Sequence, residues 1–337
     1  GHELDPTIEG PKFYKRNGYY YIFAPAGGVS TGWQVVLRAK NVFGPYERRV
    51  VMDQGATSIN GPHQGAWVNT IAGEDWFIHF QDKGAYGRIV HLQPMTWRND
   101  WPVIGVDKDG DGKGEPVSMY KKPKVASLSK VVTPGDSDEF NQNTIGLQWQ
   151  WQANPKATWA FINNNTGSLR LYTQKIPGEA KSLWHIPNLL LQKFPAEEFT
   201  VTTKITFRPN FQIENENIGL VVMGMSYAGM SVSSSKNGLS INHISCKDAG
   251  KDGAEVVVNI QQVHLQTIYF RTVVSKGAKC AFFYSLDGEK FISTGEVFQA
   301  TPGKWIGAKV GLFATRSEQS NDAGYADIDW FRIEPNN

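Results

Sequence analysis

Short runs in which apolar and polar residues alternate follow one another along the 337-residue chain. In the run from Phe199 to Phe207, residues 199, 201, 203, 205 and 207 are Phe, Val, Thr, Ile and Phe, which places a largely apolar set on one face of a β-strand. No long stretch has the 3.6-residue period of an amphipathic helix. The pattern therefore predicts an all-β protein.

The first third of the chain is typical of short strands joined by tight turns. Asn17-Gly18, inside the aromatic segment Lys12 to Phe23, is a strong signal for a two-residue hairpin loop. The other predicted strands are Tyr19 to Ala24, Gln34 to Ala39, Gly65 to Ile71, Asp75 to Gln81 and Gly87 to Leu92. Four-stranded units of this size indicate propeller blades, and there is room for about two to three of them where a closed propeller has about four to eight. We expect the ring to need further blades from outside this chain.

The composition changes at Lys121-Lys122-Pro123-Lys124 and again at Thr133-Pro134-Gly135. We interpret residues 121–135 as a linker between a propeller part at 1–120 and a second domain at 136–337. Beyond the linker the predicted strands lengthen. They are Phe199 to Phe207, Ile218 to Met225, Ala254 to Gln261, Thr267 to Val274, Lys279 to Ser285, Glu289 to Ser293, Trp305 to Ala314 and Tyr325 to Ile333. About a dozen strands in roughly 200 residues favour a two-sheet sandwich of the jelly-roll type.

The amino-acid composition limits the classes of partner that are expected. The formal net charge is +2 and charged residues make up 20% of the chain, so neither nucleic acid nor an anionic membrane is an expected partner. There is no uninterrupted apolar run of about 18 residues that would predict a membrane span. The two cysteines, Cys246 and Cys280, are compatible with one disulfide or with two buried free thiols.

One carboxylate near the start of the chain is a candidate catalytic residue. Glu9 lies in Ile8-Glu9-Gly10-Pro11, on a stiff Gly-Pro turn just before the aromatic hairpin. A carboxylate held next to aromatic surface is suited to donate a proton in a sugar-cleaving site. Its partner carboxylate would precede it in sequence, so we interpret the chain as an incomplete glycosidase. The alternative is an exposed loop carboxylate without catalytic function.

Several motifs, taken in order, resemble glycoside hydrolase family 43, in the branch of β-xylosidases and α-L-arabinofuranosidases. In the first part of the chain these are Ile8 to Pro11, Gly61 to Val68, Trp76 to Phe80, Gly87 to Pro94 and Trp101 to Gly105. In the second part they are Asp138 to Phe140, Leu147 to Trp151 and Ser168 to Leu171. The resemblance implies a five-bladed β-propeller, represented here by its C-terminal part, followed by a concanavalin-like β-sandwich.

The family resemblance also implies an inverting mechanism with three acidic residues. Glu9 matches the glutamate that acts as general acid, whereas the general base Asp and the second Asp, which tunes the acid, have no counterpart in this chain. An inverting enzyme keeps acid and base about 6.5–9.5 Å apart so that a water molecule fits between sugar and base. Asp5 lies too close in sequence to Glu9 to be a convincing substitute.

Three further residues are candidates for the substrate site. Arg88 matches the arginine that reaches the innermost sugar in this family, and a surface salt bridge is its alternative. His63 matches a histidine near the propeller axis that lies by the substrate and helps to hold a central metal ion through water; the alternative is a packed, hydrogen-bonded histidine. Trp33, on the glycine-rich loop after the hairpin, is a candidate for stacking on a sugar ring.

Alternating aspartates near the end of the predicted propeller part, just before the linker, resemble the start of a calcium-binding loop. The predicted ligands are Asp107, Asp109, Asp111 and Glu115, and the ion would have a structural function. Ser118 stands at the twelfth position, where such loops usually have Glu, and no flanking helices are predicted. A solvated acidic hairpin is the alternative. Asp138, Glu139 or Asp327 could serve a second calcium ion in the sandwich.

The leading hypothesis is an exo-acting, inverting hydrolase that releases xylose from the ends of xylan or xylo-oligosaccharides. An α-L-arabinofuranosidase is the alternative of the same class, and a non-catalytic carbohydrate-binding fragment is the alternative of another class. The expected partners are xylan or arabinoxylan oligosaccharides and the missing propeller half, for which a second polypeptide is one source. The family habit favours a secreted or periplasmic location, with the cytoplasm as the alternative.

Overall fold

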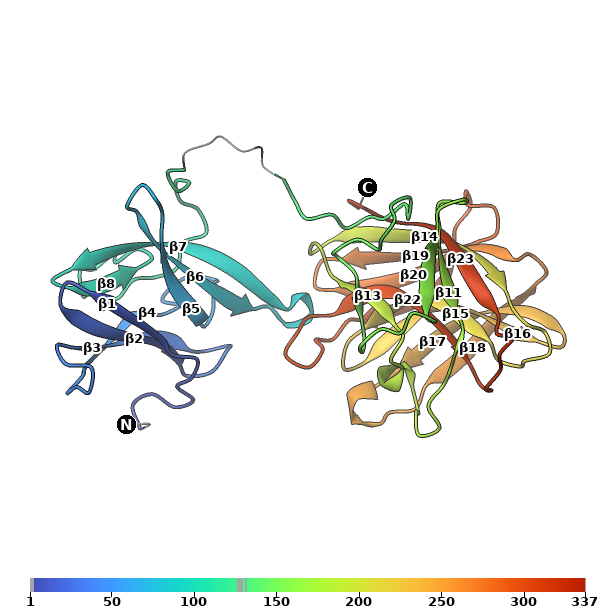
Figure 1. Cartoon of the computed structure of the whole chain (residues 1–337), viewed down its shortest axis with the longest axis horizontal. Helices are drawn as coiled ribbons and strands as arrows, with labels where there is room; N and C mark the ends of the chain where they lie inside the picture. Colours follow the sequence, from blue (N-terminus) through green and yellow to red (C-terminus); the bar gives the residue numbers. More distant parts are fainter. Residues whose placement is uncertain (1–2, 126–129, 131, 337) are drawn as a thin grey trace. The chain divides into compact units, whose positions relative to one another are not determined.

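The computed structural model describes residues 3–125, 130 and 132–336. It is all-β, as predicted, with 49% of residues in strands and 3% in helices. The chain divides into two compact units, which are described separately below (Figure 1). The first comprises Gly1–Lys83 and Arg88–Val131, and the second comprises Gly84–Gly87 and Val132–Asn337.

The first unit contains two antiparallel four-stranded sheets, each with its strands in sequence order, which is the arrangement of propeller blades. One sheet consists of β1 (Lys12–Arg16), β2 (Tyr19–Ala26), β3 (Trp33–Ala39) and β4 (Glu47–Met52). The other consists of β5 (His63–Asn69), β6 (Asp75–Asp82), β7 (Arg88–Arg98) and β8 (Trp101–Ile104). Asn17 and Gly18 both have positive φ, at 49° and 78°, as a two-residue hairpin turn of this kind requires.

Aromatic side chains form much of the core of this unit. Phe23 of β2 and Phe77 of β6 are fully buried and stack with ring centroids 6.2 Å apart. Tyr14 of β1 lies against Trp67 of β5 at 5.2 Å, and its hydroxyl accepts a hydrogen bond from the Trp67 amide. The aromatic richness of the hairpin therefore serves first to pack the two blades together.

The second unit is a sandwich of two large sheets. The strand order is β10-β11-β23-β14-β19-β20-β21 in one sheet and β18-β17-β16-β15-β22-β13-β9 in the other, where β12 also pairs with β22. The bounds are β9 Gln150–Trp151, β10 Ala160–Asn163, β11 Ser168–Tyr172, β12 Gln174–Lys175, β13 Leu190–Lys193, β14 Phe199–Arg208, β15 Asn217–Met223, β16 Tyr227–Ser235, β17 Gly238–Cys246, β18 Val256–Val263, β19 Thr267–Ser275, β20 Lys279–Ser285, β21 Ile292–Gln299, β22 Lys309–Arg316 and β23 Tyr325–Glu334. Three 3₁₀ turns complete the described elements: η1 Gly84–Tyr86, η2 Leu183–His185 and η3 Ala249–Lys251.

The sandwich core lies between the two sheets and follows the predicted alternation. In β14, Phe199, Val201, Ile205 and Phe207 are buried in it, and the hydroxyl of Thr203 donates to the carbonyl of Trp330 at 2.9 Å. A smaller apolar cluster covers part of the outer face of the eight-stranded sheet, beneath the segment that contains η2. Cys246 and Cys280 are both buried free thiols. None of the described helices, each a single turn, has the length and apolar character needed to cross a bilayer.

Two predicted strands begin three or four residues later than expected. β22 starts at Lys309 rather than Trp305, because Trp305 has a φ of 62° that an extended strand does not adopt. β21 starts at Ile292 rather than Glu289, since the carboxylate of Asp287 accepts hydrogen bonds from the amides of Glu289 and Lys290 and thereby prolongs the turn.

Candidate active site

The backbone around Glu9 is fixed just before the first blade begins. The Glu9 amide donates to the carbonyl of Pro25 at the end of β2, at 3.2 Å. The next residue, Gly10, has a φ of 53°, and a Cβ there would lie only 2.1 Å from Oε1 of Gln64. Glycine at this position therefore allows Gln64 to approach the Glu9 turn.

Two side chains of the second blade hold the Glu9 carboxylate. Nε2 of His63 lies 2.9 Å from Oε1 of Glu9, and Nε2 of Gln64 donates to the same oxygen at 3.1 Å. The strand register is irregular between His63 and Ala66, and such bulges re-aim neighbouring side chains. No hydrogen bond between described residues reaches Oε2 of Glu9. One carboxylate oxygen is thus fixed while the other remains available.

The same contacts set the charge state of Glu9. The hydrogen bond with His63, followed by that from Gln64, holds the pKa of Glu9 below its usual range, and the positive charge of Arg88 acts in the same direction. A general acid has to carry a proton near the working pH, which calls for a raised pKa. A second carboxylate nearby raises a pKa by like-charge repulsion. The described residues therefore stabilise the Glu9 anion, which suits its state after proton transfer.

Arg88 belongs to the same group through an aromatic ring. Its exposed guanidinium lies over the ring of Phe80, 4.6 Å from the centroid, and that ring is 5.8 Å from the His63 imidazole. Phe80 faces His63 across the β5–β6 pair. Sequence reasoning missed Gln64 and Phe80 as site residues. The register of the hairpin, with Phe80 opposite His63, is the signal that would have found Phe80.

His63 is 1% exposed, and its Nδ1 atom is buried without a hydrogen-bond partner in the described part of the chain. If Nε2 carries the proton shared with Glu9, Nδ1 keeps a lone pair that can accept from water or bind a cation. The predicted association of His63 with a metal ion is chemically compatible with this atom. His63 therefore connects the Glu9 carboxylate to a buried acceptor position.

Trp33 and Asp5 anchor the N-terminal arm, which is the segment of residues 3–11 that precedes β1. The indole of Trp33 donates to Asp5 at 3.2 Å, and its ring fills the space next to Gly27, where a Cβ would lie 2.5 Å away. Arg48 binds both oxygens of Asp5, which is 3% exposed. This hydrogen-bonded pair lowers the pKa of Asp5. A carboxylate with both oxygens engaged is poorly placed to activate water, so Asp5 supports the arm.

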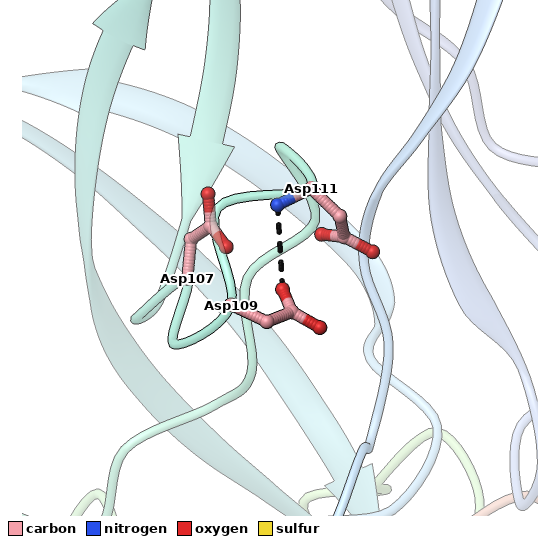
Figure 2. A group of neighbouring side chains, drawn as sticks. All are labelled: Asp107, Asp109 and Asp111. Atoms are coloured by element: carbon pink, nitrogen blue, oxygen red, sulfur yellow. Dashed lines mark hydrogen bonds between the residues drawn. The ribbon is translucent and has the colours of Figure 1, made fainter.

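Three aspartates of the predicted calcium loop lie together (Figure 2). One oxygen from each of Asp107, Asp109 and Asp111 lies within 4.8 Å of the other two. Glu115 is instead paired with Lys108, at 2.5 Å. Asp107 folds the loop, because its carboxylate accepts from the amides of residues 110 and 112 and from Arg98. The three carboxylates form a set of hard oxygen donors that fits calcium.

The acidic residues considered for a second calcium ion in the sandwich have separate partners. Asp327 forms a two-pronged pair with Arg170, at 2.7 and 2.9 Å. Glu139 forms a similar pair with Arg332, and Asp138 accepts from the Trp149 indole at 2.9 Å. Among the described residues, these three do not form a common group.

Comparison with known families agrees with this arrangement. Residues 5–102 match the glycosyl hydrolases of family 43, and residues 137–334 match the β-xylosidase C-terminal concanavalin A-like domain. The chain belongs to glycoside hydrolase family 43 and carries the C-terminal concanavalin-like domain of its β-xylosidase branch.

Three curated relatives align with almost the whole chain. A candidate β-xylosidase of Xylanibacter ruminicola is 40% identical over 92% of this chain and 55% of its own length. A β-xylosidase of Formosa agariphila is 31% identical over 97% of this chain and 59% of its own length. A non-reducing end α-L-arabinofuranosidase of Bacteroides ovatus is 28% identical over 96% and 62%. The chain thus spans less than two thirds of the length of these relatives.

Solved structures share the fold. A bifunctional family 43 protein of Bacteroides eggerthii superimposes with a TM-score of 0.78 at 29% identity, over 98% of this chain and 41% of that one. A xylan β-1,4-xylosidase of Bacillus halodurans superimposes with a TM-score of 0.82 at 21% identity, over 99% of this chain and 66% of that one. These likenesses support a propeller-type first unit and a concanavalin-like second unit.

Proposed function

We propose that this chain supplies the general acid and a sugar-binding arginine to an exo-acting, inverting glycosidase that releases xylose from xylan or xylo-oligosaccharide ends. The observation that carries the proposal is the Glu9 carboxylate: His63 and Gln64 fix one oxygen and leave the other free. The guanidinium of Arg88, held over Phe80, belongs to the same group.

In this proposal Oε2 of Glu9 donates a proton to the glycosidic oxygen as the bond to the leaving sugar breaks. The resulting anion is stabilised by the hydrogen bonds of His63 and Gln64 to Oε1. The general base, which activates the attacking water, and the carboxylate that raises the Glu9 pKa would come from blades outside this chain.

Arg88 would orient the sugar. Its planar guanidinium can donate to two adjacent hydroxyls at once, which a lysine at the same position could not do. The ring of Phe80 supports the guanidinium from one side and leaves its donors free to point elsewhere. The expected effect of Arg88 is therefore on substrate affinity and on the orientation of the scissile bond.

Xylose is the favoured sugar because the relative with 31% identity is named as a β-xylosidase and the one with 40% identity as a candidate β-xylosidase. An α-L-arabinofuranosidase is the second candidate, since a relative with 28% identity has that name. A non-catalytic carbohydrate-binding protein remains the alternative of another class, because the described acidic residues offer no convincing base.

Exposed apolar side chains on one face of the second blade support the expectation that further blades pack against this chain. Ile78 of β6 and Leu92 of β7 face each other across the strand pair, as do Phe80 and Val90. Ile78, Val90 and Leu92 are exposed to solvent. Adjacent apolar positions on one blade face are what a neighbouring blade would cover. We propose that further propeller blades, in the same or a second polypeptide, pack there.

Calcium is the proposed metal. Asp107, Asp109 and Asp111 would hold a structural ion in the loop, through hard carboxylate oxygens. The buried Nδ1 of His63 would accept from a water molecule that belongs to a second cation. Neither ion is assigned a step in the chemistry above.

The decisive experiment compares substrates that differ in leaving group. The chain, reconstituted with the segment that completes the propeller, would be assayed on xylobiose, on 2,4-dinitrophenyl β-D-xyloside and on the corresponding α-L-arabinofuranoside. Glu9→Gln should lose about 10²-fold or more in kcat on xylobiose and far less on the dinitrophenyl substrate, which leaves without protonation. Glu3→Gln, on the same arm, is the control. Equal losses on both xylosides would exclude Glu9 as the acid, and binding without any hydrolysis would favour the non-catalytic alternative.

A further inference from the structure

The outer face of the eight-stranded sheet contains a cavity of about 300 Å³. Strands β15, β16, β17 and β22 form its floor. Alternate residues of these strands point into the sandwich core, and the residues between them line the cavity. The cavity belongs entirely to the second unit. None of its lining residues belongs to the Glu9 group, which consists of Glu9, His63, Gln64, Phe80 and Arg88.

The lining forms two rows across the strands. In one row Thr315, Asn217 and Ser233 are register neighbours. In the other, Phe313, Gly219, Ser231 and Asn242 follow one another. A Cβ at Gly219 would lie 2.6 Å from the Phe313 ring, so glycine gives this ring its place on the sheet. One row thus offers polar groups, and the other combines an aromatic ring with polar groups.

Several polar groups of the lining have no protein partner. Ser231 and Thr315 are each 2% exposed, and no hydrogen bond between described residues involves either hydroxyl. Asn217 is partly buried; its Nδ2 donates to the carbonyl of Asn215, and no hydrogen bond between described residues reaches its Oδ1. Buried polar groups are normally hydrogen-bonded. These groups line the cavity, so a ligand or water inside it is their available partner.

Other lining groups are already oriented. Nδ2 of Asn242 donates to the hydroxyl of Ser233 at 2.9 Å, and Nδ2 of Asn259 donates to Oδ1 of Asn242 at 3.2 Å. This chain of hydrogen bonds fixes the Asn242 amide without help from a ligand. A pre-oriented lining lowers the entropy cost of binding.

The cavity lining contains two ionisable side chains, those of Lys181 and Glu255. Lys181 lies 3.9 Å from Asp252, and the carboxyl of Glu255 accepts a hydrogen bond from the Tyr227 hydroxyl. The remaining lining is neutral, with hydroxyls and amides beside the apolar side chains of Ile244, Val257 and Phe313. Among the described residues, the one cation in the lining is Lys181, which is paired with Asp252, so a phosphate or carboxylate ligand is not favoured. A sugar ring, with hydroxyls around its edge and C–H groups on its faces, fits both kinds of lining.

We propose that this cavity is a binding site for a neutral saccharide, in which Ser231, Thr315 and Asn217 bind the hydroxyls of a xylo-oligosaccharide. The saccharide character follows from the lining, whereas the choice of xylose units rests on the proposed function. The site would hold the polymer on the sandwich while chain ends are cleaved at Glu9.

Calorimetric titration of xylotriose into the full chain tests the proposal. All proteins would carry Glu9→Gln and Arg88→Ala, so that the Glu9 group contributes neither turnover nor the arginine contact. Ser231→Ala combined with Thr315→Val should weaken binding at least tenfold. Thr315→Val alone is nearly isosteric and should weaken it measurably, which guards against a folding defect in the double variant. Thr272→Val is the matched control, because Thr272 is also buried with an unpartnered hydroxyl but lies in the other sheet.

Absence of xylotriose binding at millimolar concentration would overturn the proposal, as would binding that the double variant leaves unchanged. Thermal unfolding of each variant would establish that it is folded. Failure of the proposed enzymatic function would show separately, as absence of hydrolysis by the reconstituted protein with intact Glu9. Saccharide binding at the cavity does not depend on that outcome.

Discussion

The imidazole of His63 and the carboxylate of Glu9 meet at 2.9 Å across two blades, although 54 positions separate them in sequence. His63 is 1% exposed, whereas the Glu9 side chain is 52% exposed. A donor fixed in the core thus orients a carboxylate that faces solvent. This combination allows an exposed loop residue to have a defined position.

Replacing His63 should raise the pKa of Glu9. In His63→Leu the largest stabilising contact of the carboxylate is lost, so protonation should become easier and the titration midpoint should move to higher pH. Gln64→Leu should move it in the same direction by a smaller amount. Carboxyl ¹³C NMR titration of the two variants measures both effects. An unchanged midpoint in His63→Leu would mean that the His63 contact does not determine the Glu9 charge.

The pair of Asp5 and Arg48 should stabilise the first unit. Asp5 is buried and accepts from Arg48 through both oxygens, so Asp5→Asn should cost ~1.5–3 kcal/mol of unfolding free energy at pH 7. Urea unfolding followed by tryptophan fluorescence measures this. Glu47→Gln, which breaks the exposed pair with Arg38, is the control and should cost less than about 1 kcal/mol.

The pH dependence of the Asp5 contribution has a definite sign. Its folded pKa is lowered, so the stabilisation is present above the unfolded pKa of about 3.9 and is lost as the pH falls through the folded value. The stability difference between the native protein and Asp5→Asn should therefore shrink below about pH 4. A difference that stays constant down to pH 2 would show that the ionised carboxylate is not what stabilises the arm.

The sequence predicted features with strong local signals. The Asn17-Gly18 turn and the alternation of β14 depend on backbone preference and on one buried face, both of which are local properties. The pairing of Glu9 with His63 is different. It depends on a bulge after His63 and on the close approach of Gln64 to Gly10, which no local pattern encodes. Only the family resemblance pointed to both residues.

The strands β16 and β17 are among those that the sequence analysis did not predict, and their composition is one reason. Their outward residues include Ser231, Ser233 and Asn242, which line the cavity. Gly229 replaces a side chain where the strands approach closely. Small polar residues and glycine are weak strand formers. Ala228, Met230 and Val232 still alternate with these outward residues, but small and polar side chains weaken the strand signal.

Calcium should stabilise the first unit through the aspartate loop. With a Kd on the order of 10⁻⁴ M, 1 mM calcium would add about 1.4 kcal/mol and raise the melting temperature relative to a sample in EDTA. Asp109→Asn combined with Asp111→Asn should remove this increase. Asp107 is left in place because it folds the loop. Asp287→Asn, in a turn of the sandwich, is the control, and equal melting temperatures with calcium and with EDTA would contradict the proposed ion.

Buried His79 should make the first unit sensitive to mild acid. Burial lowers its pKa to about 4, from an ordinary value of 6.5, and its ring stacks on that of His91 at 5.5 Å. Between pH 6.5 and 4, His79 binds a proton in the unfolded chain but not in the folded protein. The free energy of unfolding should therefore fall as the pH is lowered, by up to about 3 kcal/mol. His79→Asn, which keeps a donor for the Phe80 carbonyl, should flatten this slope. His91, whose pKa is also lowered by burial, should retain part of it.

Urea unfolding at a series of pH values measures the slope, with His264→Asn as an exposed control. A slope that is equally steep without His79 would assign the acid sensitivity to other groups.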